Sequence, residues 1–130
     1  MGKEKGGVLG SVDLVGDAAS VAYARSWVKE LLGVGHPALE NVVLVVSELV
    51  TNSVRHSNSR DGGRITLVIA EADGVVRGDV ADAGAESVPR VCADAEGEGG
   101  RGMFLVDHIA HEWGFRDDAA GRVVWFEVKY

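Results

Sequence analysis

The sequence predicts an α+β fold in which helices cover one face of a mostly antiparallel sheet. Two segments near the start, residues 18–32 and 38–55, have the apolar spacing of amphipathic helices. Later segments are short, rich in β-branched residues and separated by turn signals, which is typical of antiparallel strands. Helices and a sheet that each have one apolar face bury both by packing as two layers, so we expect a two-layer α/β sandwich.

The composition excludes several classes of protein. With 130 residues, of which 46% are hydrophobic, the chain is long enough for one domain with a single core. Ser47 and Glu48 interrupt the apolar run Val42–Val50, so we expect no membrane span. The net charge of -7 argues against direct nucleic-acid binding, because phosphates are held by clustered Lys and Arg. The start lacks the apolar block of a secretory signal and the chain has one cysteine, so we expect a cytoplasmic location.

The first third of the chain predicts one strand and one helix. We expect residues 1–10 to be a flexible N-terminus and residues 11–130 to be the domain, although Val8–Val15 is apolar and β-branched enough to be a first strand. Asp17 is a good N-cap for a helix over Ala18–Leu32. Pro37 then lies near the first position of the next helix, where proline is favoured.

The second predicted helix, Ala38–Arg55, has a polar strip at the edge of a broad apolar arc. The arc consists of Leu39, Val42, Val43, Val45, Val46, Leu49, Val50 and Val54. Glu48, Asn52 and His56 are four residues apart and therefore lie on one strip of the helix. A carboxylate and a carboxamide beside an apolar face are costly unless something binds them, although such a strip is more often simply solvated.

The second half of the chain predicts a hairpin, a long loop, a short helix and two final strands. Arg64–Ala70 and Val75–Val80 form the hairpin around the turn signal Asp73-Gly74, and the glycine-rich residues 82–102 form the loop. The remaining elements are a helix over Met103–His111 and strands over Gly114–Arg116 and Val123–Tyr130, with a turn at Ala120-Gly121.

Two glycine motifs add candidate binding groups. Asp82-Ala-Gly84 follows a strand, where the glycine lets the backbone turn or approach a ligand, although plain turn chemistry is the commoner explanation. Gly100-Arg101-Gly102 precedes a predicted helix, whose unpaired N–H groups could bind an anion with help from the Arg101 charge. The alternative for this second motif is a flexible surface loop.

Other kinds of site are disfavoured. Gly97, Gly99 and Gly102 fit G-x-G-x-x-G, but neither a strand before them nor a βαβ unit around them is predicted. The chain has no P-loop motif, and His108 and His111 lack a third metal ligand at a recognisable spacing.

In this order, the three motifs resemble the N box, G1 box and G2 box of the GHKL ATPase family, whose domain has the Bergerat fold. The chain is most similar to the small, single-domain branch of anti-sigma factor serine/threonine-protein kinases, in its actinobacterial form. The segments Ala24–Val28, Trp113-Gly114 and Gly121–Glu127 add to the resemblance, which extends from about Ser11 to the end.

The resemblance implies a role for each motif. Asn52 would coordinate the Mg²⁺ that bridges the ATP phosphates, and Glu48 would orient or deprotonate the attacking hydroxyl. Asp82 would accept the adenine amino group, and Gly84 would leave room for the ring. The implied phosphate-binding residues are Gly100 and Gly102, through backbone N–H groups, and Arg101 at the terminal phosphate, with Met103 completing the motif.

The resemblance also implies a function. The protein would phosphorylate a Ser or Thr of an anti-sigma antagonist, sequester a sigma factor, form a homodimer, and offer the surface around Arg25 to its partners. Val123 and Val124 occupy the strand region where relatives often carry a Thr, which puts one nucleotide contact in doubt. The alternative is therefore a nucleotide-binding module that acts by sequestration alone. The ATPase domain of a histidine kinase is disfavoured, because the only histidine before the N box, His36, is beside Pro37 in a loop.

Overall fold

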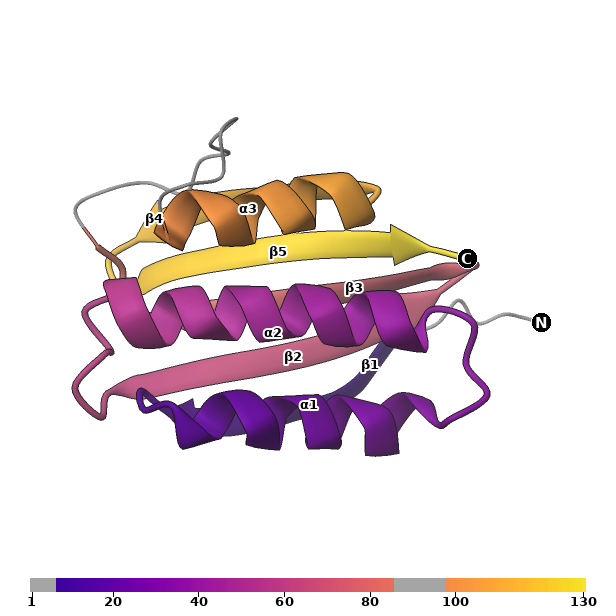
Figure 1. Cartoon of the computed structure of the whole chain (residues 1–130), viewed down its shortest axis with the longest axis horizontal. Helices are drawn as coiled ribbons and strands as arrows, with labels where there is room; N and C mark the ends of the chain where they lie inside the picture. Colours follow the sequence, from indigo (N-terminus) through magenta and orange to yellow (C-terminus); the bar gives the residue numbers. More distant parts are fainter. Residues whose placement is uncertain (1–6, 86–97) are drawn as a thin grey trace.

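The computed structural model describes residues 7–85 and 98–130, apart from the side chains of residues 98–102. The chain forms two layers, with helices packed on one face of a sheet (Figure 1). The elements are β1 (Gly7–Val15), α1 (Ala19–Leu32), α2 (Leu39–His56), β2 (Arg64–Ala72), β3 (Val75–Asp82), α3 (Glu98–Ile109), β4 (Glu112–Asp118) and β5 (Gly121–Lys129). This arrangement confirms the predicted α+β two-layer fold.

The described strands form one sheet in the order β1-β2-β3-β5-β4, and every neighbouring pair is antiparallel. β3 is the central strand, and its register places Asp82 opposite Arg122 of β5. Asp82 is therefore at the end of a strand that is hydrogen-bonded on both sides, which fixes the position of its backbone.

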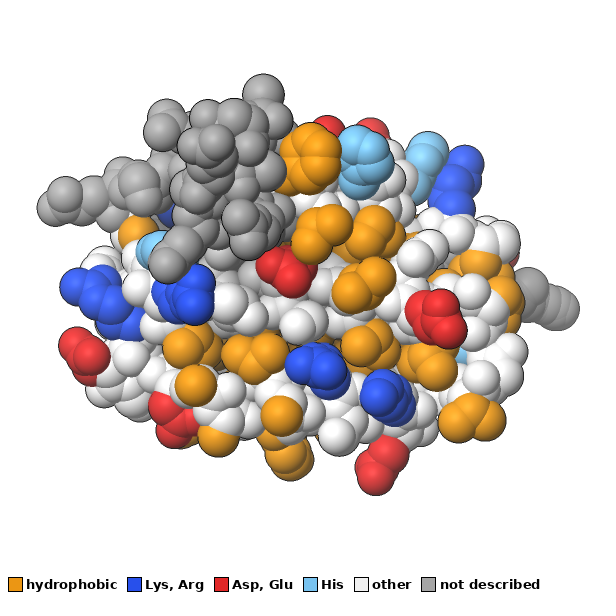
Figure 2. Space-filling model, in the orientation of Figure 1, with side chains coloured by type: hydrophobic (Ala, Val, Ile, Leu, Met, Phe, Trp, Pro, Cys, Tyr) orange, Lys and Arg blue, Asp and Glu red, His pale blue; other side chains and the backbone are white. Residues whose placement is uncertain are grey.

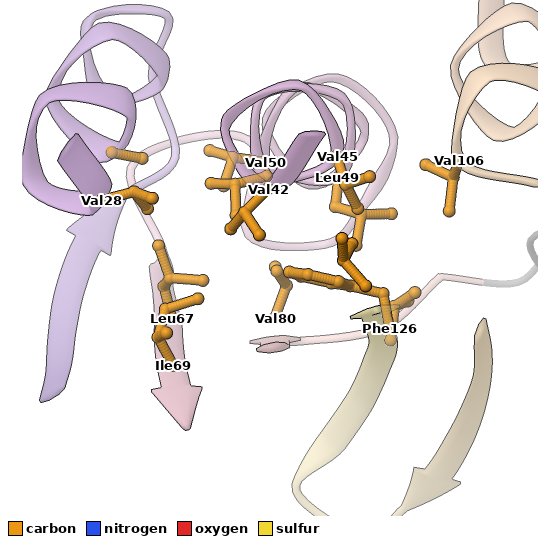
Figure 3. Close-up of a cluster of buried hydrophobic side chains, with 14 of the residues drawn as sticks. Val28, Val42, Val45, Leu49, Val50, Leu67, Ile69, Val80, Val106 and Phe126 are labelled. Atoms are coloured by element: carbon orange, nitrogen blue, oxygen red, sulfur yellow. The ribbon is translucent and has the colours of Figure 1, made fainter. Parts of the chain in front are cut away.

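The core lies between the sheet and the central helix α2. Figure 3 shows Val45 and Leu49 of α2 above Phe126 of β5, with Val106 of α3 approaching from one side. Phe126 is fully buried and crosses Gly78 of β3, where an added Cβ would collide with its ring. The apolar arc predicted for α2 is confirmed, since it supplies the buried residues Val42, Val45, Val46, Leu49 and Val50.

Two predicted boundaries were wrong. β1 begins at Gly7 and pairs with β2, so residues 7–10 belong to the sheet and not to a flexible N-terminus. α3 begins at Glu98, five residues before the predicted start at Met103. The glycines argued against a helix there, but a glycine costs only about 1 kcal/mol in a helix, which burial of Met103 and Val106 can offset.

The other predicted elements are confirmed to within a few residues. The N-cap of α1 is Ala18, one residue after the predicted Asp17, and it makes no side-chain cap. Asp17 still bonds to the first turn, because its Oδ1 accepts a hydrogen bond from the N–H of Ala19 at 3.0 Å. The turn at Asp73-Gly74 is also confirmed, with φ angles of 54° and 78°. The predicted loop up to residue 97 is outside the described residues beyond Ala85.

None of the helices in the described part of the chain is both long and apolar enough to cross a membrane. The helix-bearing face is instead mixed in character, with Lys and Arg side chains among the hydrophobic ones (Figure 2). On α1 this mixture includes exposed Tyr23, Arg25 and Lys29.

Candidate functional site

Asn52, Asp82 and Met103, one from each predicted motif, lie at one end of the sheet. The end of α2, the end of β3 and the beginning of α3 all lie there (Figure 1). Direct contacts join them: Ser53 to Asp82 at 2.6 Å, and Asn52 to Met103 at 3.4 Å. These contacts bring together three motifs that are far apart in the sequence.

Asn52 contributes a carboxamide on the side of α2 that faces α3. Its Nδ2–H donates to Sδ of Met103 at 3.4 Å, a weak acceptor. Its Oδ1 accepts no hydrogen bond from any residue that the structure describes. A half-buried carboxamide oxygen that receives no hydrogen bond from the described residues is a suitable ligand for a hard cation such as Mg²⁺.

A cation at Asn52 would need most of its ligands from elsewhere. Within residues 7–85 and 98–130, no group of three or more His, Cys, Asp or Glu side chains is arranged to hold a metal ion. Mg²⁺ commonly keeps several waters and takes its remaining ligands from substrate phosphates, so a single protein oxygen is compatible with an ion that arrives with a nucleotide.

Glu48 lies one turn before Asn52 on the same side of α2. It shares this side with Val45 and Leu49, which pack toward α3 (Figure 3). Its side chain is half-buried and makes no hydrogen bond or ion pair with another part of the described chain. This carboxylate is therefore held on a rigid helix beside an apolar layer, and no described residue bonds to its oxygens.

Asp82 is held at both carboxylate oxygens. Oδ2 accepts a hydrogen bond from the Ser53 hydroxyl at 2.6 Å, and Oδ1 accepts one from the Gly84 N–H at 2.7 Å. Gly84 has a φ of +84°, which side-chain-bearing residues rarely adopt, so a glycine is needed to aim this N–H at the carboxylate. Each carboxylate oxygen has a second lone pair that can still accept a hydrogen bond from a ligand.

A group of serines, which the sequence analysis missed, connects α2 to the segment after β3. The Ser57 hydroxyl donates to the Ser53 carbonyl at 2.7 Å and accepts from the Ser59 N–H at 3.0 Å. The Ser59 hydroxyl in turn accepts from the Ala83 N–H at 3.0 Å. All three serines are buried. Their close spacing in the sequence, at the end of an apolar helix, was the signal that could have predicted this group.

The beginning of α3 carries the third motif. Because the helix begins at Glu98, Gly100 is among the first four residues, whose N–H groups have no partner within a helix, and Gly102 lies just beyond them. The Arg101 side chain is outside the described residues. Met103 is buried between α3 and α2, so its placement next to Asn52 is the described link between this motif and α2.

Arg122 of β5 borders the site next to Asp82, which it faces across the β3–β5 pair. It is buried, donates to both oxygens of Asp117 at 2.6 and 3.3 Å, and donates to the Ala85 carbonyl at 3.2 Å. The hydrogen bond from Arg122 lowers the pKa of Asp117 below its ordinary value of 3.8. Arg122 thus fastens the segment that follows Gly84 to the sheet.

The two valines in β5 have different environments. Val124 is 8% exposed and belongs to the core beneath the helices, where it pairs with Val80. Val123, one residue earlier, points to the opposite face because side chains alternate along a strand. Only Val124 therefore lies on the side of the sheet that carries the site. His56 is exposed at the end of α2, where a histidine suits the helix dipole.

Comparison with known proteins identifies the fold. A family model described as the histidine kinase-like ATPase domain matches residues 14–128. A crystal structure of the RsbU and RsbW domains of Rv1364c from Mycobacterium tuberculosis is similar, with a TM-score of 0.67 at 20% identity. That match covers 92% of this chain and 32% of the other, and at this identity it shows the fold alone. No curated protein matches the chain.

Proposed function

The chain belongs to the family of histidine kinase-like ATPase domains, and from this premise we propose that it is an ATP-dependent serine/threonine-protein kinase and anti-sigma factor. It binds ATP with Mg²⁺, phosphorylates an anti-sigma antagonist protein, and sequesters a sigma factor. The observation that carries the proposal is the convergence of Asn52, Asp82 and Met103 from three separate elements on one end of the sheet.

The base-binding part of the proposed site is at Asp82. Its carboxylate accepts a hydrogen bond from the amino group of adenine, through a lone pair that Ser53 and Gly84 leave free. Gly84, which has no side chain, leaves space for the ring. An ionised Asp prefers a base that presents a donor to one that presents a carbonyl, so the pocket favours adenine.

The phosphate-binding part of the proposed site lies between α2 and α3. Asn52 would hold Mg²⁺ through Oδ1, and the ion would supply positive charge for the phosphates. The Gly100 N–H and the guanidinium of Arg101 bind the phosphate oxygens, and Gly102, which has no side chain, leaves them room beside the helix. Met103 holds the start of α3 against Asn52.

Glu48 is the proposed catalytic residue. It accepts the proton of a Ser or Thr hydroxyl as that oxygen attacks the terminal phosphorus of ATP and the bond to the β,γ-bridging oxygen breaks, which releases ADP. Its position one turn before Asn52 places a proton acceptor beside the metal-binding group on one rigid helix.

The proposed partners are proteins of a sigma-factor regulatory system. The resemblance of the three motifs to those of anti-sigma factor kinases supports a sigma factor and an antagonist as partners. In this proposal the protein acts as a homodimer in the cytoplasm. It does not bind nucleic acid directly, in keeping with its net charge of -7.

Phosphate transfer from labelled ATP tests this proposal. The chain, Mg²⁺, γ-labelled ATP and the antagonist protein should give a labelled antagonist. Glu48→Ala should lower the rate by at least about 100-fold while ATP still binds, because general bases typically contribute that much. Glu40→Ala, an exposed carboxylate on the same helix, is the matched control and should transfer phosphate normally. Transfer that is unchanged in Glu48→Ala would contradict the role of Glu48.

A second candidate is a module that binds nucleotide but transfers no phosphate. Val124, apolar and buried in β5, favours it, because the resemblance leads us to expect a hydroxyl contact to the nucleotide from this strand. Calorimetry with ATP and Mg²⁺ separates the two candidates: binding without transfer to the antagonist supports the module, whereas binding with transfer supports the kinase.

A further inference from the structure

Ser53 is an unusual residue for its position in the fold. It lies in the last part of α2, and 4% of its surface is exposed. A serine inside a helix usually points to solvent or bonds to the carbonyl one turn earlier. Ser53 instead donates to Oδ2 of Asp82 on a different element, at the short distance of 2.6 Å that is typical of a bond to an ionised carboxylate.

This bond decides how Asp82 is oriented. With Oδ1 held by the Gly84 N–H at 2.7 Å and Oδ2 held by Ser53, the carboxylate cannot rotate without losing one of the two bonds. A carboxylate held in this way presents only acceptor lone pairs to a ligand. Ser53 therefore controls the direction of the group that faces a bound base.

Further bonds fix Ser53 relative to the segment after β3. The Ser57 hydroxyl donates to the Ser53 carbonyl, and the Asn58 N–H donates to the Gly84 carbonyl at 2.6 Å. The Asn58–Gly84 bond, with the bond from the Ala83 N–H to the Ser59 hydroxyl at 3.0 Å, ties the segment after α2 to the segment after β3, close to the Ser53–Asp82 bond. A side chain that is held in this way does not have to be ordered when a ligand binds.

The β5 side of Asp82 does not supply the same group. The residue of β5 opposite Asp82 is the buried Arg122, and the next residue on the same face is Val124; neither carries a hydroxyl. The hydroxyl next to Asp82 therefore comes from α2.

We propose that Ser53 is a positioning residue for base recognition, which acts through Asp82 to select purine nucleotides with an amino group at C6 over those with a carbonyl there. This inference rests on the proposed function, because it presumes that the base of a nucleotide binds at Asp82. It adds to that function the residue on which base selectivity depends.

Calorimetric titration with ATP and with inosine triphosphate, both with Mg²⁺, tests the inference. The unsubstituted chain should prefer ATP. Ser53→Ala should weaken ATP binding by about 10- to 100-fold, because a carboxylate no longer held by Ser53 loses its hydrogen bond from the adenine amino group. Binding of inosine triphosphate, which has no such amino group, should weaken much less. Ser53→Thr keeps the hydroxyl and should retain the preference, and Ser47→Ala on the same helix is the matched control.

A second set of variants separates positioning from general damage to the fold. Ser53→Cys fills nearly the same space but donates only a weak hydrogen bond, so it should lose the preference for ATP as Ser53→Ala does. It replaces Ser53→Ala in the test if that variant does not fold. Adding Ser53→Ala to Asp82→Asn should cause no further loss of selectivity, because the serine acts through the carboxylate.

The outcomes distinguish this inference from the proposed function. If the unsubstituted chain binds neither nucleotide, the proposed function fails and the inference fails with it. If it binds ATP but Ser53→Ala keeps the same preference, or weakens both nucleotides equally, the inference alone is overturned.

Discussion

Asn52 and Met103 touch across α2 and α3, with 3.4 Å between Nδ2 and Sδ, although they are 51 residues apart in the sequence. The contact occupies the nitrogen of the carboxamide and leaves its oxygen available. Because Met103 is buried, the contact also couples the position of α3 to the residue proposed to bind the metal. The two ends of the proposed phosphate site are therefore part of one packed unit.

Asn52→Ala should make ATP binding insensitive to Mg²⁺. In the proposed site Asn52 provides the protein oxygen for the ion, so its loss should weaken Mg²⁺-dependent ATP binding by about tenfold or more. In the presence of a chelator the variant and the unsubstituted chain should bind ATP alike. Calorimetry with and without Mg²⁺ measures both values.

Asn41→Ala is the matched control for this prediction, since Asn41 is exposed near the other end of α2. It should bind ATP with the normal dependence on Mg²⁺. If Asn52→Ala retains that dependence as well, the metal is held by other groups.

Leu49→Ala should destabilise the fold strongly. Leu49 is 2% exposed and packs above Phe126 between the layers (Figure 3). Removing its side chain should lower the free energy of unfolding by about 2–5 kcal/mol, because the transfer free energy is lost and a cavity remains. Urea unfolding followed by circular dichroism gives the value.

Leu44→Ala on the same helix should change the free energy of unfolding by no more than about 0.5 kcal/mol, since Leu44 is 46% exposed. Equal losses of unfolding free energy for Leu49→Ala and Leu44→Ala would mean that α2 does not bury the face that carries Leu49.

Asp117→Asn should change the acid dependence of stability. Arg122 lowers the pKa of Asp117 in the folded state below the ordinary 3.8. Folded Asp117 thus binds protons less readily than unfolded Asp117, so its stabilisation is present above about pH 4 and is lost as the pH falls through the lower, folded pKa. The difference in unfolding free energy between the variant and the unsubstituted chain should be constant near neutral pH and shrink in acid.

Arg122→Gln provides the background that checks the cause. Without the guanidinium, Asp117→Asn should show no acid-dependent difference in unfolding free energy. A difference that stays constant through the acid range in the original chain would show that the Asp117–Arg122 contact at 2.6 Å does not contribute to stability.

Most of the fold could be predicted because its elements have strong local patterns. α2 combines an apolar arc of helical period with a preceding proline, and the β2–β3 hairpin has the turn signal Asp73-Gly74. The start of α3 could not be predicted, because glycine content suggests a loop unless packing with another helix is known. Burial of Met103 and Val106 under α2 is such packing, and it acts between residues that are distant in the sequence.

The sequence by itself determined the two-layer fold class, the polar strip of Glu48 and Asn52, and the turn at Asp82-Ala-Gly84, since each depends on residues within a few positions of one another. Only the tertiary structure decided that Ser53 bonds to Asp82, that Val124 and not Val123 faces the site, and that Met103 touches Asn52. These relationships depend on strand register and on how helices lie across the sheet. Both are set by packing of the whole core, which no local pattern specifies.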